Sequence, residues 1–302
     1  MIRPKSVVVV PTRNRLDHLR SLLSCLETQT FIPEEVIVVS SSDHPAEEEF
    51  AVREFTRLKI DFIHSKIKSA AIQRNTGIDK ISNEIDYLVF LDDDVRPSES
   101  YLESLLREFS DPKVVGVSGV AVSAKSPHLR ELPRGLLGLY YRFFLLDSKR
   151  DGSLLRSGIN IPVRKYAKKS VEVDWLIGCA AWRFSSLGST RFEKDFYGQS
   201  LAEDVIFSLR MSKKGKLRVL PWLLLNHDEA VHGRAIGKAF WSMWVVNHWR
   251  LAEVRDFSVL CKTAFLWSTF GQTVILLAQK LLQKDYYPGS LRGIVLGLRE
   301  IM

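Results

Sequence analysis

Three consecutive carboxylates, Asp92, Asp93 and Asp94, follow the apolar run Tyr87–Leu91 without a spacer. The run predicts a buried strand, so the carboxylates lie beyond its carboxyl end, where open α/β sheets bind their ligands. Three adjacent negative charges beside a buried strand repel one another and require a neutralising cation. A hard divalent metal ion that joins carboxylate to phosphate oxygens would meet this requirement. The alternative is a solvated acidic turn before a helix that begins near 97–100.

The first 110 residues alternate short β-branched runs with segments of helical spacing. This alternation predicts right-handed crossovers and a doubly wound, mainly parallel α/β sheet flanked by helices. Phe50, Phe55 and Leu58 are expected on one side of the second helix. The expected strands are 6–10, 36–39, 60–63 and 87–91, and the expected helices are 16–26, 47–58, 70–80 and 102–109.

The second half of the chain is less regular and ends in helices. The patterns predict strands at 114–120, 171–177 and 218–220, a helix that opens at Glu203, and a long excursion over 124–170. Three helices are expected near 237–254, 258–283 and 290–301. We expect a catalytic domain at 1–235, with a nucleotide-binding half (1–110) and an acceptor half (111–235), and a helical C-terminal extension at 236–302.

The composition is that of a folded globular protein. The chain has 302 residues, of which 46% are hydrophobic and 26% charged. A net charge of +8 indicates an anionic partner without choosing among nucleotide, membrane and nucleic acid. Cys25, Cys179 and Cys261 show no metal-type or redox-type spacing, which favours packing roles in a reducing compartment. The amino terminus leads directly into a strand and leaves no room for a signal peptide, so we expect a cytoplasmic protein.

The segment Phe257–Leu282 is apolar on most faces, but the polar residues Ser268, Thr269, Gln272 and Thr273 interrupt it and predict a poor membrane span. Two alternatives remain. The segment lies in the headgroup region of an anionic bilayer, at the inner face of the cell membrane, or it packs on the catalytic domain or a second subunit. The tryptophans and cations around it are Trp241, Trp244, Trp249, Lys262, Lys280, Lys284 and Arg292.

Six motifs, taken in order, resemble those of the inverting glycosyltransferases of family 2, which have the GT-A fold. Each motif is short and can occur by chance, but six motifs in the same order as in the family are a specific signal. The resemblance covers roughly residues 6–230. The motifs are Val10-Pro11-Thr12-Arg13-Asn14, a second strand before a polar loop, Arg74-Asn75-Thr76-Gly77, Leu91-Asp92-Asp93-Asp94, Gly178, and Glu203-Asp204 with Arg210.

The resemblance implies a nucleotide-sugar donor whose diphosphate is held by Mg²⁺ or Mn²⁺. It makes Asp92-Asp93-Asp94 the DxD motif, with Asp92 near the ribose and Asp94 on the metal. His227 stands where some relatives place a further metal or diphosphate ligand, and His232 competes with it. The other residues implied in donor binding are Pro11, Thr12, Arg13, Asn14, Arg74, Asn75 and Asp93.

The chain departs from the family after the second strand. Family members commonly carry a base-reading aspartate there, whereas this chain has Ser40-Ser41-Ser42 and only then Asp43. Hydroxyls of Ser40 and Ser42 can still hydrogen-bond a base edge, but they discriminate less sharply than a carboxylate. The identity of the base is therefore open.

On the acceptor side, Asp204 matches the family's catalytic base and Glu203 is the next candidate. A carboxylate near a helix start is kept ionised by the helix dipole and can take the acceptor hydroxyl's proton. The alternative is an ordinary helix-opening acid. Trp175 and Trp182 flank Gly178 and either stack on a sugar ring or fill the core. Arg210 completes the expected acceptor site.

These observations predict a metal-dependent inverting glycosyltransferase of the hexosyltransferase type. It would move a sugar from a nucleotide-sugar to a hydroxyl of a glycan or lipid-linked acceptor, in surface polysaccharide or glycoprotein glycan synthesis, without a nucleic-acid partner. One rival is a nucleotidyltransferase acting on sugar phosphates, but Pro11-Thr12-Arg13-Asn14-Arg15 lacks the glycines of a phosphate-gripping loop. The other is a non-catalytic binding subunit of the same fold, which retention of Asp94 and Asp204 argues against.

Overall fold

The structure, a computed structural model, divides the chain into two compact units. The first, the sheet unit, combines residues 1–129 and 165–230, and the second, the helical unit, combines 130–164 and 231–302. Residues 130–164 were expected in the catalytic domain at 1–235, whereas the structure groups these residues with the C-terminal helices. The described residues are 4–81, 85–123, 135–164, 166–194, 202–228, 236–256, 258–284 and 286–302.

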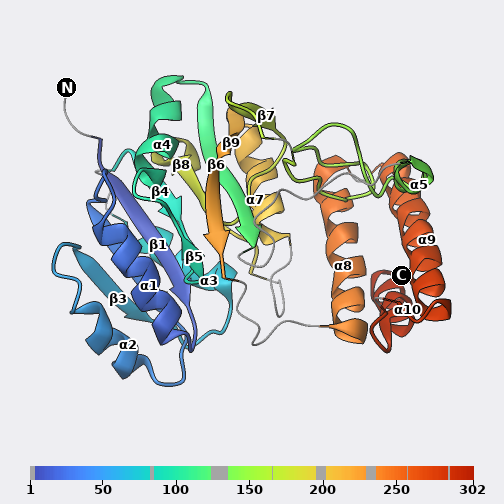
Figure 1. Cartoon of the computed structure of the whole chain (residues 1–302), viewed down its shortest axis with the longest axis horizontal. Helices are drawn as coiled ribbons and strands as arrows, with labels where there is room; N and C mark the ends of the chain where they lie inside the picture. The colour runs from blue at the N-terminus through green and yellow to red at the C-terminus, as the bar shows by residue number, and fades with distance from the viewer. Residues whose placement is uncertain are drawn as a thin grey trace. The chain divides into compact units, whose positions relative to one another are not determined.

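The sheet unit is built on a nine-stranded sheet, which is visible with its helices in Figure 1. In the described residues the order is β3-β2-β1-β4-β8-β6-β9-β5, and β7 pairs with β9. The first four strands of this order are parallel, as predicted. Strand β8 is antiparallel to both β4 and β6, which makes the second half mixed. The strands are β1 (Ser6–Thr12), β2 (Glu35–Ser40), β3 (Ile60–His64), β4 (Tyr87–Phe90), β5 (Val95–Arg96), β6 (Val114–Ser123), β7 (Val171–Val173), β8 (Ala180–Arg183) and β9 (Lys216–His227).

Helices cover the sheet because successive side chains of a strand point to opposite faces. Val8 and Val10 of β1 share a buried cluster with the leucines of α1. Val9 lies against α3, where a Cβ on Gly77 would come within 2.4 Å of its side chain, so only glycine allows this approach. The helices of the sheet unit are α1 (Leu16–Glu27), α2 (Pro45–Val52), α3 (Ala70–Lys80), α4 (Tyr101–Arg107) with the 3-10 turn η1 (Glu108–Ser110), α6 (Phe184–Leu187) and α7 (Glu203–Ser212).

Several element predictions need correction. Strand β7 ends at Val173 rather than at Ile177. Helix α2 ends at Val52, so Phe50 does not share a buried face with Phe55 and is 69% exposed. Strand β8 was not predicted, because Ala180–Arg183 is a short run. Strand β9 runs through Pro221 to His227 rather than ending at Leu220. The last difference matters for function, because it carries His227 to the end of a strand.

The helical unit contains α5 (Gly135–Phe143), α8 (Gly237–Asp256), α9 (Val259–Leu281) and α10 (Ser290–Ile301). The last three match the predicted segments closely, while α5 lies in the stretch predicted as an irregular excursion. Helix α9, predicted to be a poor membrane span, has the length and composition of a membrane-crossing helix, with a mean hydropathy of 1.3 over an 18-residue window, of which 39% is buried. Its Ser268 and Thr269, expected to interrupt an apolar face, are buried inside the unit instead.

Candidate active site

The acidic cluster at the end of β4 meets the loop that follows β1. The Thr12 hydroxyl donates to Asp93 at 2.8 Å, and the Arg15 guanidinium contacts Asp93 at 3.0 Å and Asp94 at 3.3 Å. Burial raises the pKa of Asp93 to about 6, although Arg15 and Thr12 oppose this effect. The neutralising cation that the sequence argument required is therefore supplied in part by the protein itself. Arg15 was not predicted as a site residue.

Strand β9 brings His227 to the same cluster. Its Nε2 lies 2.9 Å from Asp94 Oδ1, and the Asp228 amide donates to the Asp94 carbonyl at 2.8 Å. The part of the chain that the structure describes has no group of three His, Cys, Asp or Glu side chains that could hold a metal. One carboxylate beside one imidazole nevertheless fits a divalent ion that takes its other ligands from a diphosphate and water. The competing His232 lies outside the described residues.

Arg74 joins two motifs that are distant in sequence. Its guanidinium is buried, contacts Asp92 at 2.6 Å and forms a short ion pair with Glu203. The backbone of Gly178 lies beside it, since an added Cβ would be 3.0 Å from Arg74 Nη2. Burial lowers the pKa of Arg74, but the charges of Asp92 and Glu203 outweigh it and raise the net value. The ion pairs fix the start of α7 beside the end of β4.

Asp204 follows Glu203 in the first turn of α7 and is only half-buried. Its carboxylate accepts the Val205 amide at 2.8 Å. Desolvation raises its pKa to about 6, although the charge of Arg74 opposes the shift. Glu203 forms an ion pair with Arg74, so Glu203 and Asp204 have different environments although they are adjacent in sequence. The catalytic role assigned to either residue stays a prediction.

The loops after β1 and β2 are held together by side chains. Asn14, which has a left-handed φ of 54°, donates from its amide nitrogen to Asp43 at 2.9 Å and accepts the Asp43 amide at 2.8 Å. Lys68 contacts the other Asp43 oxygen at 2.7 Å. Hydrogen bonds from Lys68 and Asn14 lower the pKa of Asp43 to about 2. Asp43 is thus an exposed, ionised carboxylate in the loop after β2.

The serines predicted to contact the base point elsewhere. Ser40 and Ser42 are buried and donate to the carboxylate of Glu48, Ser42 at 2.5 Å. Glu48 is itself 2% exposed and lies on α2. Ser42 also accepts the Asn14 amide at 2.5 Å. These hydroxyls shape the loop, so we carry Asp43 forward in their place as the candidate contact to a base.

Helix α3 supplies two further positioning residues. Gln73 donates to the carbonyls of Thr12 at 2.7 Å and Val39 at 2.6 Å, and so ties the ends of β1 and β2 together. The side-chain amide of Asn75 binds both backbone groups of Phe192, at 2.9 and 2.8 Å. Asn75 was predicted to contact the donor, but its amide is engaged with Phe192. The Phe192 ring in turn lies 5.3 Å from the Arg74 guanidinium.

The remaining predicted residues divide between core and surface. Trp182 is 2% exposed and packs on Phe207, so it fills the core and we do not carry it forward as an acceptor contact. Trp175 is also largely buried. Pro11 is buried in β1, whereas Arg13 is exposed in the loop. Arg210 forms a short ion pair with Glu193 and donates to the Arg191 carbonyl at 3.2 Å.

The sequence analysis did not identify three residues that shape the site, namely Arg15, Glu48 and Gln73. Only Arg15 has a sequence signal that could have revealed it. Arg15 is a cation in the loop after the first strand, and such loops meet the acidic edge of the same sheet. Glu48 and Gln73 lie on helices at positions whose sequence context is that of ordinary solvated residues. Cys179 was expected to pack, and it does, with a buried thiol whose pKa burial raises well above its usual value.

Comparison with curated sequences finds glycosyltransferases. The chain is 35% identical over 222 residues to "Pre-mycofactocin glycosyltransferase" of Mycobacterium tuberculosis, a match that covers 73% of this chain and 42% of that protein. It is 29% identical over 110 residues to "Glycosyltransferase GlyA" of Streptococcus pneumoniae, covering 36% of this chain and 15% of that protein. The chain thus spans less than half the length of the curated relatives it matches.

Solved structures share the fold at low sequence identity. The mannosyltransferase PcManGT from Pyrobaculum calidifontis, in complex with GDP-Man and Mn²⁺, superposes with a TM-score of 0.60 at 15% identity and covers 99% of this chain and 87% of its own. S. aureus TarS 1-349, in complex with UDP-GlcNAc, gives 0.59 at 14% identity and covers 98% and 80%. The GT-A fold predicted from the motifs is therefore confirmed.

The family model for "Glycosyl transferase family 2" matches residues 7–170, more than half of the chain. The matched segment contains the Asp92-Asp93-Asp94 cluster, Arg74 and the loop after β1. Sequence, fold and family model agree, and the chain belongs to glycosyl transferase family 2.

Proposed function

We propose that this protein is a metal-dependent, inverting glycosyltransferase that moves a hexose from a nucleotide-sugar to a hydroxyl of a glycan or lipid-linked acceptor. The observation that carries the proposal is the Arg74 bridge between Asp92 and Glu203. It sets a donor-side acidic cluster beside a half-buried carboxylate, Asp204, whose pKa is raised to about 6. A base with such a pKa is ionised at neutral pH and still binds a proton well.

In this mechanism the acceptor oxygen attacks the anomeric carbon from the face opposite the nucleoside diphosphate. Asp204 takes the proton of the attacking hydroxyl as the new oxygen–carbon bond forms. The bond between the anomeric carbon and the diphosphate oxygen breaks, and the nucleoside diphosphate leaves with the electron pair. Because one displacement occurs, the configuration at the anomeric carbon is inverted.

Asp94 and His227 would hold the metal, Mg²⁺ or Mn²⁺, on the diphosphate. The ion, when bound, would stabilise the negative charge that develops on the leaving group. Arg15 contributes a fixed positive charge to the same cluster, and Thr12 and Arg15 keep the Asp93 carboxylate in place. Arg74 pairs with Asp92, the residue that would contact the ribose by the family resemblance.

The test is a hydrolysis and transfer assay with UDP- and GDP-sugars, with and without Mn²⁺, on wild type and Asp94→Asn. Asn keeps the shape of Asp94 but removes its charge, so nucleotide affinity should fall and lose its response to Mn²⁺. Calorimetry with UDP and GDP measures that affinity directly. Equal Mn²⁺-dependent binding by the variant would contradict the metal assignment.

The location and the role of α9 belong to the same proposal. We propose a cytoplasmic protein that lies at the inner face of the membrane, with the exposed side of α9 on the lipid. Helix α9 has an exposed apolar stripe made of Val259, Leu266, Phe270, Leu277 and Leu281. This stripe, with the nearby cations Lys280, Lys284 and Arg292, suits an anionic bilayer surface. The biological setting would be the synthesis of a surface polysaccharide or glycoprotein glycan.

A further inference from the structure

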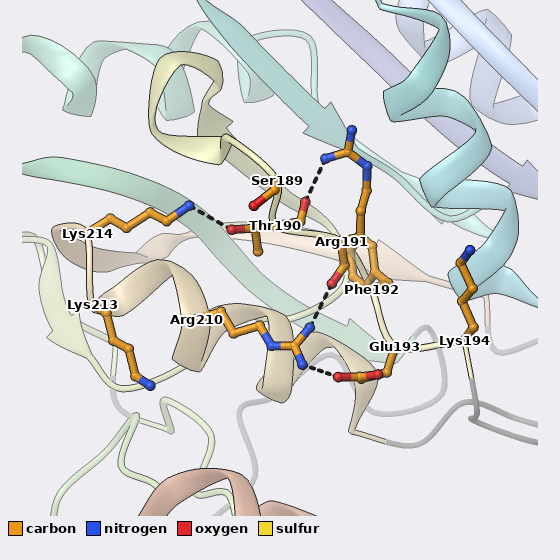
Figure 2. Close-up of a pocket in the computed structure, with 9 residues that line it drawn as sticks. All are labelled: Ser189, Thr190, Arg191, Phe192, Glu193, Lys194, Arg210, Lys213 and Lys214. Carbon is orange, nitrogen blue, oxygen red and sulfur yellow. Dashed lines mark hydrogen bonds and ion pairs between the residues drawn. The ribbon is translucent and has the colours of Figure 1, made fainter.

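A pocket of about 610 Å³ lies between the loop 189–194 and the carboxyl end of α7. Figure 2 shows Lys213 and Lys214 on one side of Arg210 and Lys194 on the other. The residues that line this cationic pocket are Ser189, Thr190, Arg191, Phe192, Glu193, Lys194, Arg210, Lys213 and Lys214.

The cationic pocket has an excess of positive charge. Its described lining includes five cationic side chains and one carboxylate, Glu193, which is paired with Arg210. Arg191 is paired with Asp79 at 2.9 Å, so the excess charge comes from Lys194, Lys213 and Lys214. Lys214 is held by the Leu187 carbonyl and the Thr190 hydroxyl, both at 2.7 Å. Lys194 and Lys213 are exposed and form no ion pair within the described residues. Like charges gathered in one hollow repel one another, and a multiply charged anion would relieve that repulsion.

The cationic pocket adjoins the proposed active site through two elements. Helix α7 carries Asp204 in its first turn and Arg210 at its other end, six residues on, which is roughly 9 Å along the helix axis. Phe192 lines the pocket, and its ring contacts Arg74, the residue that pairs with Asp92 and Glu203. None of the donor-side residues Thr12, Arg15 and Asp94 lines it. A ligand bound there is therefore on the acceptor side.

We propose that the cationic pocket binds a diphosphate group carried by the acceptor. The proposal rests on the transferase function, because it concerns that enzyme's second substrate. Lysine binds phosphate oxygens as a mobile point charge, and three lysines, Lys194, Lys213 and Lys214, line the pocket. The several cations, spread along the pocket rather than gathered at one point, suit an extended anion better than a single carboxylate. The diphosphate can belong to a lipid carrier or to a soluble compound.

The experiment compares wild type with Lys194→Gln/Lys213→Gln by calorimetry. The matched control is Lys168→Gln/Lys169→Gln, which removes the same charge from exposed residues of the sheet unit outside the pocket. The probes are farnesyl diphosphate and inorganic pyrophosphate, each titrated in excess UDP or GDP so that the donor site is filled. We expect the pocket variant to bind at least about tenfold more weakly, given the strength of hydrogen bonds to charged groups, and the control to match wild type.

Binding of farnesyl diphosphate alone supports a lipid-borne diphosphate, and equal binding of both probes supports recognition of the diphosphate itself. The proposal is overturned if wild type binds neither probe, or if the pocket variant binds as tightly as the control. Melting temperatures check that all three proteins are folded. If wild type binds neither UDP nor GDP, the transferase proposal fails, while the lysine dependence of probe binding still decides the pocket.

Discussion

The four aspartates of the site differ in what surrounds them, although they are chemically identical. Asp92 is paired with Arg74, and Asp93 is buried against Thr12 and Arg15. Asp94 meets His227, and Asp204 sits half-buried at the start of α7. In the proposed mechanism, environment rather than residue type would therefore separate the metal ligand Asp94 from the base Asp204. The pKa is raised for both Asp93 and Asp204, and of these two Asp204 has access to solvent and lies outside the Arg15 contacts.

A pH profile of transfer tests the role of Asp204. A general base must be deprotonated, so kcat/KM should fall about tenfold per pH unit below its pKa of about 6 and level off above it. Asp204→Asn removes the proton acceptor but keeps the size of the side chain and an oxygen that can accept the Val205 amide. Transfer should therefore fall by roughly 10²- to 10⁴-fold, and this acidic limb should disappear. UDP or GDP affinity and melting temperature should stay unchanged.

Asp93 is the necessary control, because its pKa is also raised to about 6. If Asp204 is the base, Asp93→Asn keeps the acidic limb even where it lowers the rate. If the acidic limb persists in Asp204→Asn and vanishes in Asp93→Asn, the titrating group is Asp93, and the proposed mechanism is contradicted. Near wild-type transfer by Asp204→Asn would place the base elsewhere.

At the scale of elements, the sequence predicted the strands and helices of the first half well, because strong β-branched runs alternate with helical spacing. Residues 70–80 were predicted as α3 with the bounds that the structure shows. Strand β8 was missed because Ala180–Arg183 is too short to show a period, although it lies between β4 and β6. The sequence did not predict the contacts of Ser40 and Asn75, because their partners, Glu48 and Phe192, are chosen by the fold and not by any local pattern.

Two variants in the loop after β2 test whether Asp43, rather than Ser40, contacts the base. Ser40→Ala takes a hydrogen bond from the buried Glu48 carboxylate, which should cost about 1–3 kcal/mol of stability and lower the melting temperature. It should leave the preference between UDP and GDP unchanged, because the hydroxyl does not face the solvent. Asp43→Asn should change the preference between UDP and GDP and leave the melting temperature nearly unchanged. The reason is that Asp43 is exposed and would contact the base rather than stabilise the core. Calorimetry and thermal melts on both variants separate these effects. A preference that shifts with Ser40→Ala and not with Asp43→Asn would restore the serine as the base contact.

At the scale of the whole molecule, the helical unit has a buried side and an unusually apolar exposed side. Cys261, Phe265 and Leu276 of α9 pack with Val245 of α8 and Ile294 of α10. Helix α5 joins α9 through Tyr140, whose hydroxyl donates to the Gly271 carbonyl at 2.7 Å, and through the Trp267 indole, which donates to the Phe143 carbonyl at 2.8 Å. The exposed stripe of α9 consists of Val259, Leu266, Phe270, Leu277 and Leu281.

This exposed stripe follows the helical period along nearly all of α9, which at about 1.5 Å per residue is roughly 35 Å long. Monomeric soluble proteins rarely leave an apolar surface of this kind uncovered, so the stripe requires an occupant. The nearby cations Lys280, Lys284 and Arg292 favour an anionic bilayer over a purely apolar subunit face. The buried Ser268 and Thr269 lie on the opposite, packed side, which suits a helix that rests on the membrane rather than crossing it.

Liposome co-sedimentation decides between these occupants. We expect wild type to sediment with vesicles that contain phosphatidylglycerol at low salt, and less so at high salt, because the attraction of the cations is screened. Leu266→Ser/Phe270→Ser should release the protein, since removing apolar area weakens interfacial binding, while hydrolysis of the nucleotide-sugar continues. Phe50→Ser is the control, because Phe50 is at least as exposed as Leu266 and Phe270 but lies on the sheet unit. If wild type stays in the supernatant and elutes as an oligomer that the double variant converts to monomer, the stripe is a subunit interface instead.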